Sequence, residues 1–356
     1  MHQVGCFMQV KDGKLDLAMN EEELKSIART LVAPRKGILA ADESFPTIKK
    51  RFDAIGVESN EENRKAYREL LFTTEGIEEF ISGVIMFDET IRQTTKDGKP
   101  FAKVLQDTGI IPGIKVDKGA VSMANFAGEK ITEGLDGLRE RLAEYKSLGA
   151  KFTKWRAVIT IGENIPTNEC IDSNAESLAR FAAASQEAGM VPIVEPEVLM
   201  DGGHDIEKSK EVGRKTLKSV FLALGRHKVT PEAMLLKPSW AHPGKDNPQK
   251  SSDEEIAEAT LNFFKEVLPD ELPGVVFLSG GDSPEDSTLH LNAMNQIGSA
   301  NWELSFSFGR ALQELVLQIW GGKEENIKLA QESFYKRAKL NSMARAGEYR
   351  KEMETG

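Results

Sequence analysis

Residues 152–198 read FTKWRAVITIGENIPTNECIDSNAESLARFAAASQEAGMVPIVEPEV, and this stretch predicts the fold of the whole chain. Two short apolar runs, Phe152 to Ile159 and Pro192 to Val198, are rich in Val and Ile and suit buried strands. Between them, Asn174 to Ala188 has the longer apolar period of an amphipathic helix. A strand, a helix and a second strand in this order predict two parallel strands joined by a helix.

The same alternation extends toward both ends of the chain. Six further apolar runs read as strands: Gly37 to Ala41, Gly83 to Phe87, Ile110 to Val116, Ala233 to Lys237, Gly274 to Leu278 and Trp302 to Phe308. The other amphipathic stretches are Glu133 to Leu148, His204 to Leu224 and Asp253 to Leu268, the last with an acidic start that suits a helix N-terminus.

Eight strands that alternate with helices predict an α/β fold, a (β/α)8 TIM barrel, with an open doubly wound sheet as the alternative. Glu21 to Val32 and Glu324 to Ala346 are predicted to be additional helices before and after the barrel. The chain of 356 residues suits a single catalytic domain over 1–356, because such barrels often exceed 250 residues. The last residues, 347–356, are predicted to form a short mobile tail.

Composition excludes several classes of protein. A hydrophobic share of 40% and a charged share of 29% are typical of a globular chain, and no apolar run approaches the length of a membrane span. The formal net charge of −10 argues against a nucleic-acid partner. Cys6 and Cys170 make no disulfide framework, and Met1 to Val10 does not have the pattern of a secretory signal, so we expect a cytoplasmic protein.

Charged or hydroxylic residues stand at or near the carboxyl ends of all eight runs, where barrel active sites lie. Three runs carry charged pairs two residues apart, and alternate residues of a strand share a face. Each pair faces either the lumen or the helices, and charges against the helices would be buried without partners. We therefore expect a shared polar site in the lumen, formed by Lys115, Lys154, Arg156, Lys237, Arg310, Asp42, Asp117, Glu195 and Glu197.

Lys237 is the member of this set with the clearest catalytic signature. It follows Met234-Leu235-Leu236, and burial beside other cations favours the neutral amine that attacks carbonyl groups. Glu195 and Glu197 would then form an acid/base pair, since two adjacent carboxylates raise the pKa of one of them. The structural alternatives are a loop lysine that points to solvent and carboxylates that only pair with Lys154 or Lys115.

Two loops suit a phosphate group. Ser279-Gly280-Gly281 follows the seventh run, and Gly309-Arg310 follows the eighth. Glycines allow backbone amides to approach an anion, arginine suits bidentate phosphate contact, and these two barrel loops commonly bind phosphate.

A metal site and a cofactor are not expected. The five histidines are scattered along the chain, without a His-Glu-x-x-His pattern: His2, His204, His227, His242 and His290. His242 lies in a loop from which it could reach the mouth of the site, but we expect it to be an exposed loop histidine instead. The residues alone thus describe a metal-free barrel enzyme that forms a Schiff base with a phosphorylated carbonyl compound.

The motifs resemble those of class I, lysine-dependent fructose-1,6-bisphosphate aldolases, from about Glu21 to about Tyr349. Seven segments carry the resemblance: Gly37-Ile-Leu-Ala-Ala-Asp-Glu-Ser44, Gly113-Ile-Lys-Val-Asp-Lys-Gly119, Lys154-Trp-Arg156, Val194-Glu-Pro-Glu-Val198, Leu235-Leu-Lys-Pro238, Phe277-Leu-Ser-Gly-Gly281 and Phe306-Ser-Phe-Gly-Arg-Ala-Leu-Gln313. The family resemblance implies reversible cleavage of fructose 1,6-bisphosphate into two triose phosphates, in glycolysis and gluconeogenesis. It also implies a homo-oligomer, often a tetramer.

The resemblance implies a role for each site residue. Lys237 would form the imine, Glu195 would move protons with support from Glu197, Asp42 would assist carbon–carbon cleavage near the C4 hydroxyl, and Lys154 would stabilise negative charge. The C1 phosphate would be bound by Ser279, Gly280, Gly309 and Arg310. The far phosphate and the hydroxyls would be bound by Ser44, Arg51, Lys115 and Arg156.

This sequence departs from the family pattern at three places. Residues 44–47, Ser44-Phe-Pro-Thr47, replace a loop that usually contains glycine, and Phe308 stands where tyrosine is common. Family members often carry a terminal tyrosine, whereas the last residue here is Gly356. Three alternatives stay open: a transaldolase-like Schiff-base barrel, a catalytically silent binding protein, and a metal-dependent aldolase, which the histidine pattern disfavours.

Overall fold

The computed structural model describes residues 21–298 and 301–355. Eight parallel strands close into a barrel in the order β1-β10-β9-β8-β7-β6-β3-β2. The strands are β1 (Gly37–Ala41), β2 (Ile81–Met86), β3 (Ile111–Lys115), β6 (Phe152–Ile159), β7 (Val191–Val198), β8 (Leu235–Leu236), β9 (Gly274–Phe277) and β10 (Glu303–Phe308). The predicted TIM barrel is confirmed, and the open-sheet alternative is wrong.

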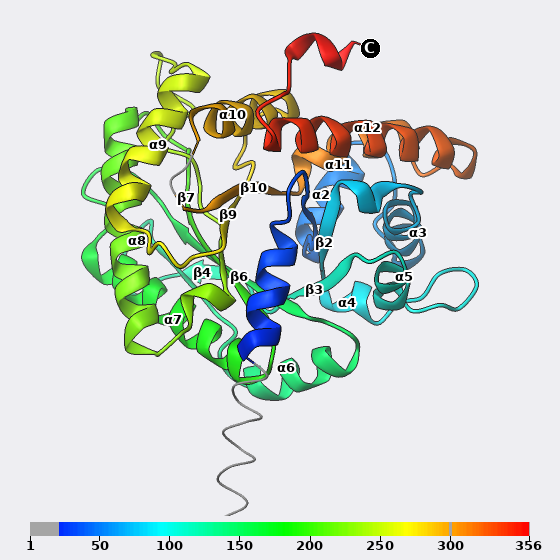
Figure 1. Cartoon of the computed structure of the whole chain (residues 1–356), viewed down its shortest axis with the longest axis horizontal. Helices are drawn as coiled ribbons and strands as arrows, with labels where there is room; N and C mark the ends of the chain where they lie inside the picture. The colour runs from blue at the N-terminus through cyan, green and yellow to red at the C-terminus, as the bar shows by residue number, and fades with distance from the viewer. Residues whose placement is uncertain (1–20, 299–300, 356) are drawn as a thin grey trace, which may run out of the picture.

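Helices surround the barrel, as Figure 1 shows. They are α2 (Phe45–Asp53), α3 (Glu61–Phe72), α4 (Asp88–Ile91), α5 (Phe101–Asp107), α6 (Leu138–Ser147), α7 (Asn168–Glu187), α8 (Ile206–Arg226), α9 (Asp253–Val267), α10 (Pro284–Ile297), α11 (Arg310–Trp320) and α12 (Ile327–Arg345). Short 3-10 helices are η1 (Ile77–Glu79), η2 (Pro231–Ala233), η3 (Glu324–Asn326) and η4 (Lys351–Glu354). Residues 21–31 form the additional N-terminal helix.

Two predicted helix starts are wrong by several residues, and capping explains both. α7 begins at Asn168 instead of Asn174, because the Thr167 side chain accepts a hydrogen bond from the backbone amide of Cys170. α6 begins at Leu138 instead of Glu133, after Gly137 in a left-handed conformation. The acidic start of α9 is confirmed, since α9 begins at Asp253 and a capping box precedes it.

A small hairpin interrupts the segment between β3 and β6. Its strands are β4 (Ala120–Ser122) and β5 (Lys130–Thr132), which pair antiparallel. The sequence analysis missed this hairpin because each strand has only three residues and β4 is exposed. Such short strands show little of the apolar alternation that predicts longer ones.

The N-terminal helix closes one end of the barrel. Leu24 and Leu31 belong to a buried cluster that also contains Phe152 and side chains from several barrel strands. An ideal Cβ on Gly113 would lie 2.3 Å from the Phe152 ring, so the glycine on β3 leaves the space that this ring occupies. With this end filled by apolar groups, the polar site forms at the opposite, carboxyl end of the strands.

The C-terminal segment packs on helices of the outer layer. Tyr349 is buried, and its hydroxyl donates a hydrogen bond of 2.8 Å to Glu354 in η4. Arg337 of α12 pairs with the same carboxylate. The mobility of 347–356, like the single-domain assignment of 1–356, stays a prediction.

In the part of the chain that the structure describes, no helix is long and apolar enough to cross a membrane. The predictions on Met1 to Val10, His2 and Cys6 fall outside the described residues. Cys170 is buried on α7 as a free thiol, and burial raises its pKa to about 11.

Candidate active site

A cavity of about 370 Å³ opens at the carboxyl ends of the barrel strands. All the side chains and glycines that the sequence analysis assigned to catalysis or substrate binding line this cavity: Asp42, Ser44, Arg51, Lys115, Lys154, Arg156, Glu195, Glu197, Lys237, Ser279, Gly280, Gly309 and Arg310. The fold thus brings together residues that come from seven strands and from the loops and helices that follow them.

A chain of ion pairs runs through the base of this cavity. The Lys237 Nζ lies 3.1 Å from Glu195 Oε1, and the Lys154 Nζ lies 3.0 Å from Glu195 Oε2. Lys154 Nζ also lies 2.7 Å from Asp42 Oδ2. Lys237, Lys154 and Glu195 are each at most 4% exposed. The alternative of a solvent-exposed loop lysine at position 237 is therefore wrong.

Strand geometry explains why these charges meet. Lys154 and Arg156 alternate along β6, Glu195 and Glu197 alternate along β7, and the register places Arg156 beside Glu195. Residues two apart on a strand share a face, so both pairs point into the lumen. Lys237 follows β8 directly, and its backbone amide still donates to the carbonyl of Val194 on β7.

The charges around Lys154 shift its pKa and that of Asp42 in opposite directions. Burial alone would raise the pKa of Asp42, but Lys154, Lys237 and Lys115 lower it to about 2. Burial alone would lower the pKa of Lys154, but Asp42, Glu195 and Asp117 raise it well above its ordinary value. Asp42 is therefore ionised and Lys154 charged throughout the neutral range.

The two glutamates of β7 differ in their electrostatic surroundings. Burial would raise the pKa of Glu195, but Lys154, Lys237 and Arg156 hold it below the ordinary value. Burial does raise the pKa of Glu197, against the attraction of Arg156 and with a smaller contribution from Glu195. Two nearby carboxylates with separated pKa values are the arrangement that acid/base chemistry uses.

Glu43 is a site residue that the sequence analysis did not assign. Its carboxylate pairs with Arg51 and with the buried Arg68, and the Gln313 amide donates a 3.0 Å hydrogen bond to it. The pairing orients Arg51, which lines the cavity. Burial opposes the charge of Glu43, but Arg68 and Arg51 still lower its pKa. Its position next to Asp42 was the available signal, whereas Arg68 lies on a helix distant in sequence.

The two predicted phosphate loops lie at the same edge of the cavity. Gly280 and Gly281 both have positive φ, at 57° and 134°, which side-chain-bearing residues rarely adopt. Arg310 is the first residue of α11, so the N-terminal end of an 11-residue helix faces the cavity. The Arg310 Nη2 donates to the carbonyl of Asp282, at 2.9 Å, which joins the two loops. Backbone amides, a helix N-terminus and a guanidinium suit an anion.

Asp117 and Lys245 are two residues at which the cavity lining differs from the predicted charged set. Asp117 was predicted in the charged set, but it does not line the cavity; it accepts a hydrogen bond from Lys115 at 2.5 Å and supports that side chain. Lys245 lines the cavity and pairs with Asp201 at 3.1 Å. Lys245 could not be predicted from the sequence because it lies in a loop, where residue spacing does not indicate the direction of a side chain.

The predicted position of His242 is wrong. Its side chain is only 17% exposed, and it does not line this cavity. The ring instead faces Asp282, the residue that follows the Ser279-Gly280-Gly281 loop. In the loop 238–245, Trp240 is buried, and its ring stacks on Phe277 of β9 at 4.2 Å between centroids.

A TIM barrel whose cavity combines a buried lysine, paired carboxylates and an anion-binding edge has the features of an enzyme that acts on phosphorylated carbonyl compounds. The family model described as glycolytic, fructose-bisphosphate aldolase class-I, matches residues 23–356. The chain therefore belongs to the class I fructose-bisphosphate aldolase family.

Similar proteins cover nearly the whole chain. A probable class 1 fructose-bisphosphate aldolase of Xanthomonas campestris is 55% identical over 333 residues, which are 93% of this chain and 100% of the relative. The cytosolic fructose-bisphosphate aldolase 4 of Arabidopsis thaliana is 51% identical, over 94% of this chain and 85% of the relative. A crystal structure of Plasmodium falciparum fructose-bisphosphate aldolase is 47% identical, with a TM-score of 0.92, and covers 94% of this chain and 96% of that chain.

These findings establish the activity of the chain as aldol cleavage of fructose 1,6-bisphosphate, and its substrates as sugar phosphates. The transaldolase-like alternative is not favoured, because the relatives and the family model agree on the aldolase.

Proposed function

We propose that Lys237 is the nucleophile that forms an imine with the C2 ketone of the sugar. The observation that carries this proposal is the contact of 3.1 Å between the buried Lys237 Nζ and Glu195 Oε1. Glu195 can accept the ammonium proton and so release the neutral amine for attack on the carbonyl carbon. Lys154 is not suited to this role, because its ammonium group pairs with two carboxylates, Asp42 and Glu195, which stabilise the protonated form.

Glu195 then returns a proton during loss of water from the carbinolamine. The nitrogen–carbon bond forms first, and the C2 hydroxyl leaves as water when Glu195 protonates it. The product is a protonated imine, which can accept the electron pair of a breaking C3–C4 bond. Glu197, with its raised pKa, supports Glu195 from the next inward position of β7.

Asp42 accepts the proton of the C4 hydroxyl while the C3–C4 bond breaks. The electron pair of that bond moves onto the imine to give an enamine, and the aldehyde leaves as glyceraldehyde 3-phosphate. The low pKa of Asp42 supports this role, since the carboxylate is already ionised. Lys154, 2.7 Å from Asp42, stabilises the negative charge that develops next to it.

The anion-binding edge takes the C1 phosphate through Ser279, Gly280, Gly309 and Arg310. Other cations that line the cavity support binding of the second phosphate and the hydroxyls: Arg51, Lys115 and Arg156, with Ser44. With the chain's net charge of −10, substrate attraction relies on this local cluster and weakens as ionic strength rises.

Borohydride trapping tests the nucleophile. The protein is incubated with dihydroxyacetone phosphate and excess EDTA, reduced, digested and mapped by mass spectrometry. We expect one stable adduct, on the peptide that contains Lys237. An adduct on Lys154 or Lys115, or turnover without any adduct, would overturn the proposed assignment.

Arg310→Ala tests the phosphate site. Loss of a charge-assisted contact costs about 1.5–3 kcal/mol, so we expect the KM for fructose 1,6-bisphosphate to rise roughly 10- to 100-fold. The kcat should fall much less, and Arg310→Lys should recover part of the loss. A variant with unchanged KM would remove Arg310 from phosphate binding. Circular dichroism checks that loss of the 2.9 Å bond to Asp282 leaves the fold intact.

The finer predictions of a cytoplasmic homo-oligomer are also proposals. Cytosolic plant relatives support the location. Exposed apolar side chains on the outer helices, such as Leu222, Leu315 and Leu329, support an interface between copies. Light scattering of the purified protein measures the mass directly, and a mass near 39.3 kDa would rule out the oligomer.

A further inference from the structure

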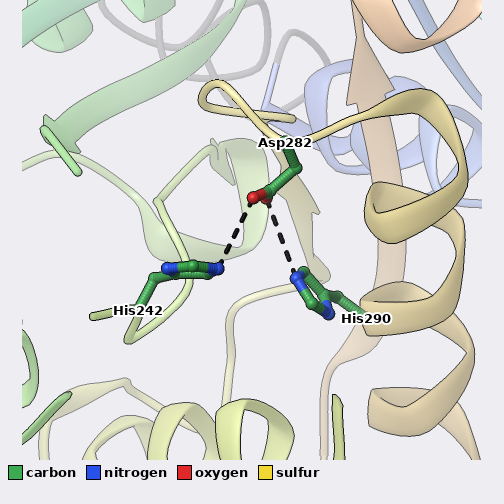
Figure 2. Close-up of side chains that lie close together, drawn as sticks. All are labelled: His242, Asp282 and His290. Carbon is green, nitrogen blue, oxygen red and sulfur yellow. Dashed lines mark ion pairs between the residues drawn. The ribbon is translucent and has the colours of Figure 1, made fainter. Parts of the chain in front are cut away.

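Behind the anion-binding edge, three potential metal ligands converge from three separate segments. Figure 2 shows the rings of His242 and His290 pointing at the carboxylate of Asp282 from two sides. His242 Nε2 lies 3.5 Å from Asp282 Oδ1, and His290 Nε2 lies 3.9 Å from Asp282 Oδ2. One ligand atom from each of the three residues lies within 4.8 Å of the other two.

The outer nitrogen of each histidine already faces an oxygen. His242 Nδ1 lies 2.6 Å from the carbonyl oxygen of Pro243, and His290 Nδ1 lies 2.7 Å from Asp253 Oδ1. An acceptor at Nδ1 favours the tautomer that carries its hydrogen there. This tautomer leaves Nε2 with a free lone pair, as in most metal-binding histidines.

The other polar atoms of the cluster are only partly hydrogen-bonded. The Trp240 indole nitrogen donates a 3.1 Å hydrogen bond to Asp282 Oδ2, as an outer partner of a metal-binding carboxylate would. His290 is only 5% exposed, yet within the described residues its Nε2 makes no hydrogen bond. A buried histidine without such a bond needs a reason.

The two rings lie on either side of the Asp282 carboxylate, 5.6 Å apart between centroids. A single divalent ion suits this arrangement, because it can bind both rings and the carboxylate together.

We propose that His242, Asp282 and His290 form a binding site for one divalent transition-metal ion, with Zn²⁺ as the best match. Two imidazole nitrogens and one carboxylate oxygen are a common zinc ligand set. In a tetrahedral site the ligand atoms would be roughly 3.4 Å apart, so the side chains need to close in by about 1 Å. A small cavity beside His242 and Asp282 leaves room for a fourth ligand such as water.

The site is separate from the ion pairs of the catalytic cavity. Its ligands do not line that cavity, although Asp282 follows the Ser279-Gly280-Gly281 loop directly. The carbonyl of Asp282 accepts the hydrogen bond from Arg310, so a bound ion would anchor both loops of the anion-binding edge. This anchoring role rests on the proposed phosphate site, whereas the metal site itself does not.

Metal binding is measured first, without any assay of activity. The full-length protein is stripped with EDTA, freed of chelator, and titrated with Zn²⁺ by calorimetry and with Co²⁺ by absorption. We expect one equivalent with visible Co²⁺ bands of a low-coordinate site. We expect His290→Asn and the more exposed His242→Ala each to weaken this equivalent at least about 100-fold.

His227→Asn is the matched control, because His227 also contacts a carboxylate, Glu176 at 2.8 Å, but lies outside the cluster. It should leave the metal titration unchanged. The proposal is overturned when His242→Ala and His290→Asn, folded by circular dichroism, bind Zn²⁺ as the parent protein does, or when the parent protein binds none.

The anchoring role is measured as the dissociation constant for inorganic phosphate, with and without one equivalent of Zn²⁺. We expect at least threefold tighter binding in the parent protein and no change in His242→Ala. Unchanged phosphate affinity beside a confirmed Zn²⁺ equivalent would overturn the anchoring role. A failure of the phosphate site itself would show separately, as Arg310→Ala without effect.

Discussion

Lys237→Met is expected to lower kcat by at least about 10⁴-fold, the largest effect of any single substitution in this protein. Methionine has nearly the length of lysine and fills the same buried position, so packing is largely preserved. Among the described residues, it removes the one amine that contacts Glu195 without also contacting Asp42. Without the imine, the C3–C4 bond would have to break to an unstabilised carbanion. The measurements are steady-state turnover and borohydride trapping, which should give no adduct.

Chemical rescue separates loss of the amine from loss of structure. In Lys237→Cys, bromoethylamine alkylates the thiolate with loss of bromide, which rebuilds an amine of nearly lysine length. Turnover should return in part, and the trapped adduct should map to position 237. The parent protein treated in the same way controls for alkylation of Cys6 and Cys170. A Lys237→Met variant that keeps more than about 1% of activity would contradict the proposed nucleophile.

Glu195→Gln is expected to have the second largest effect, a fall in kcat of about 10²- to 10⁴-fold. The amide keeps the shape of the side chain but cannot accept the proton of Lys237 or return it to the carbinolamine. It also leaves Lys154 and Lys237 without the carboxylate that lies 3.0 and 3.1 Å from them. Rapid-quench borohydride trapping should show slower imine formation, with the adduct still on Lys237.

Glu197→Gln is the matched control for this prediction. Glu197 lies two residues further along β7, faces the same cavity and pairs with Arg156 instead of a lysine. We expect it to reduce kcat about tenfold or less, because it supports the proton transfer without performing it. If Glu197→Gln proves as damaging as Glu195→Gln, the two roles must be exchanged. The raised pKa of Glu197 would then be the feature that identifies the acid.

The charged pairs at the strand ends show how much of the site could be predicted from the sequence. Lys154 and Arg156, like Glu195 and Glu197, are two residues apart within an apolar run. A strand turns this spacing into a shared face, and a parallel barrel collects the ends of its strands at one opening. The short period of the strand was sufficient to place these four side chains in one cavity.

Longer-range partners could not be predicted in this way. Glu43 was visible beside Asp42, but its partners Arg68 and Gln313 lie on helices 25 and 270 residues away. His242 and His290 are scattered in the sequence, and they meet at Asp282 because the loop after β8 carries one ring there and α10 carries the other. No short period of strand or helix relates such positions.

The eight strands, their parallel order and the inward direction of the charged pairs are thus consequences of local patterns in the amino-acid sequence. Apolar runs bury themselves, and backbone geometry sets which side chains share a face. The partner of each charge, the direction of its pKa shift and the cluster around Asp282 depend instead on distances across the barrel. Electrostatic energy depends on separation in space and on burial, and neither quantity exists for a residue until the chain has folded around it.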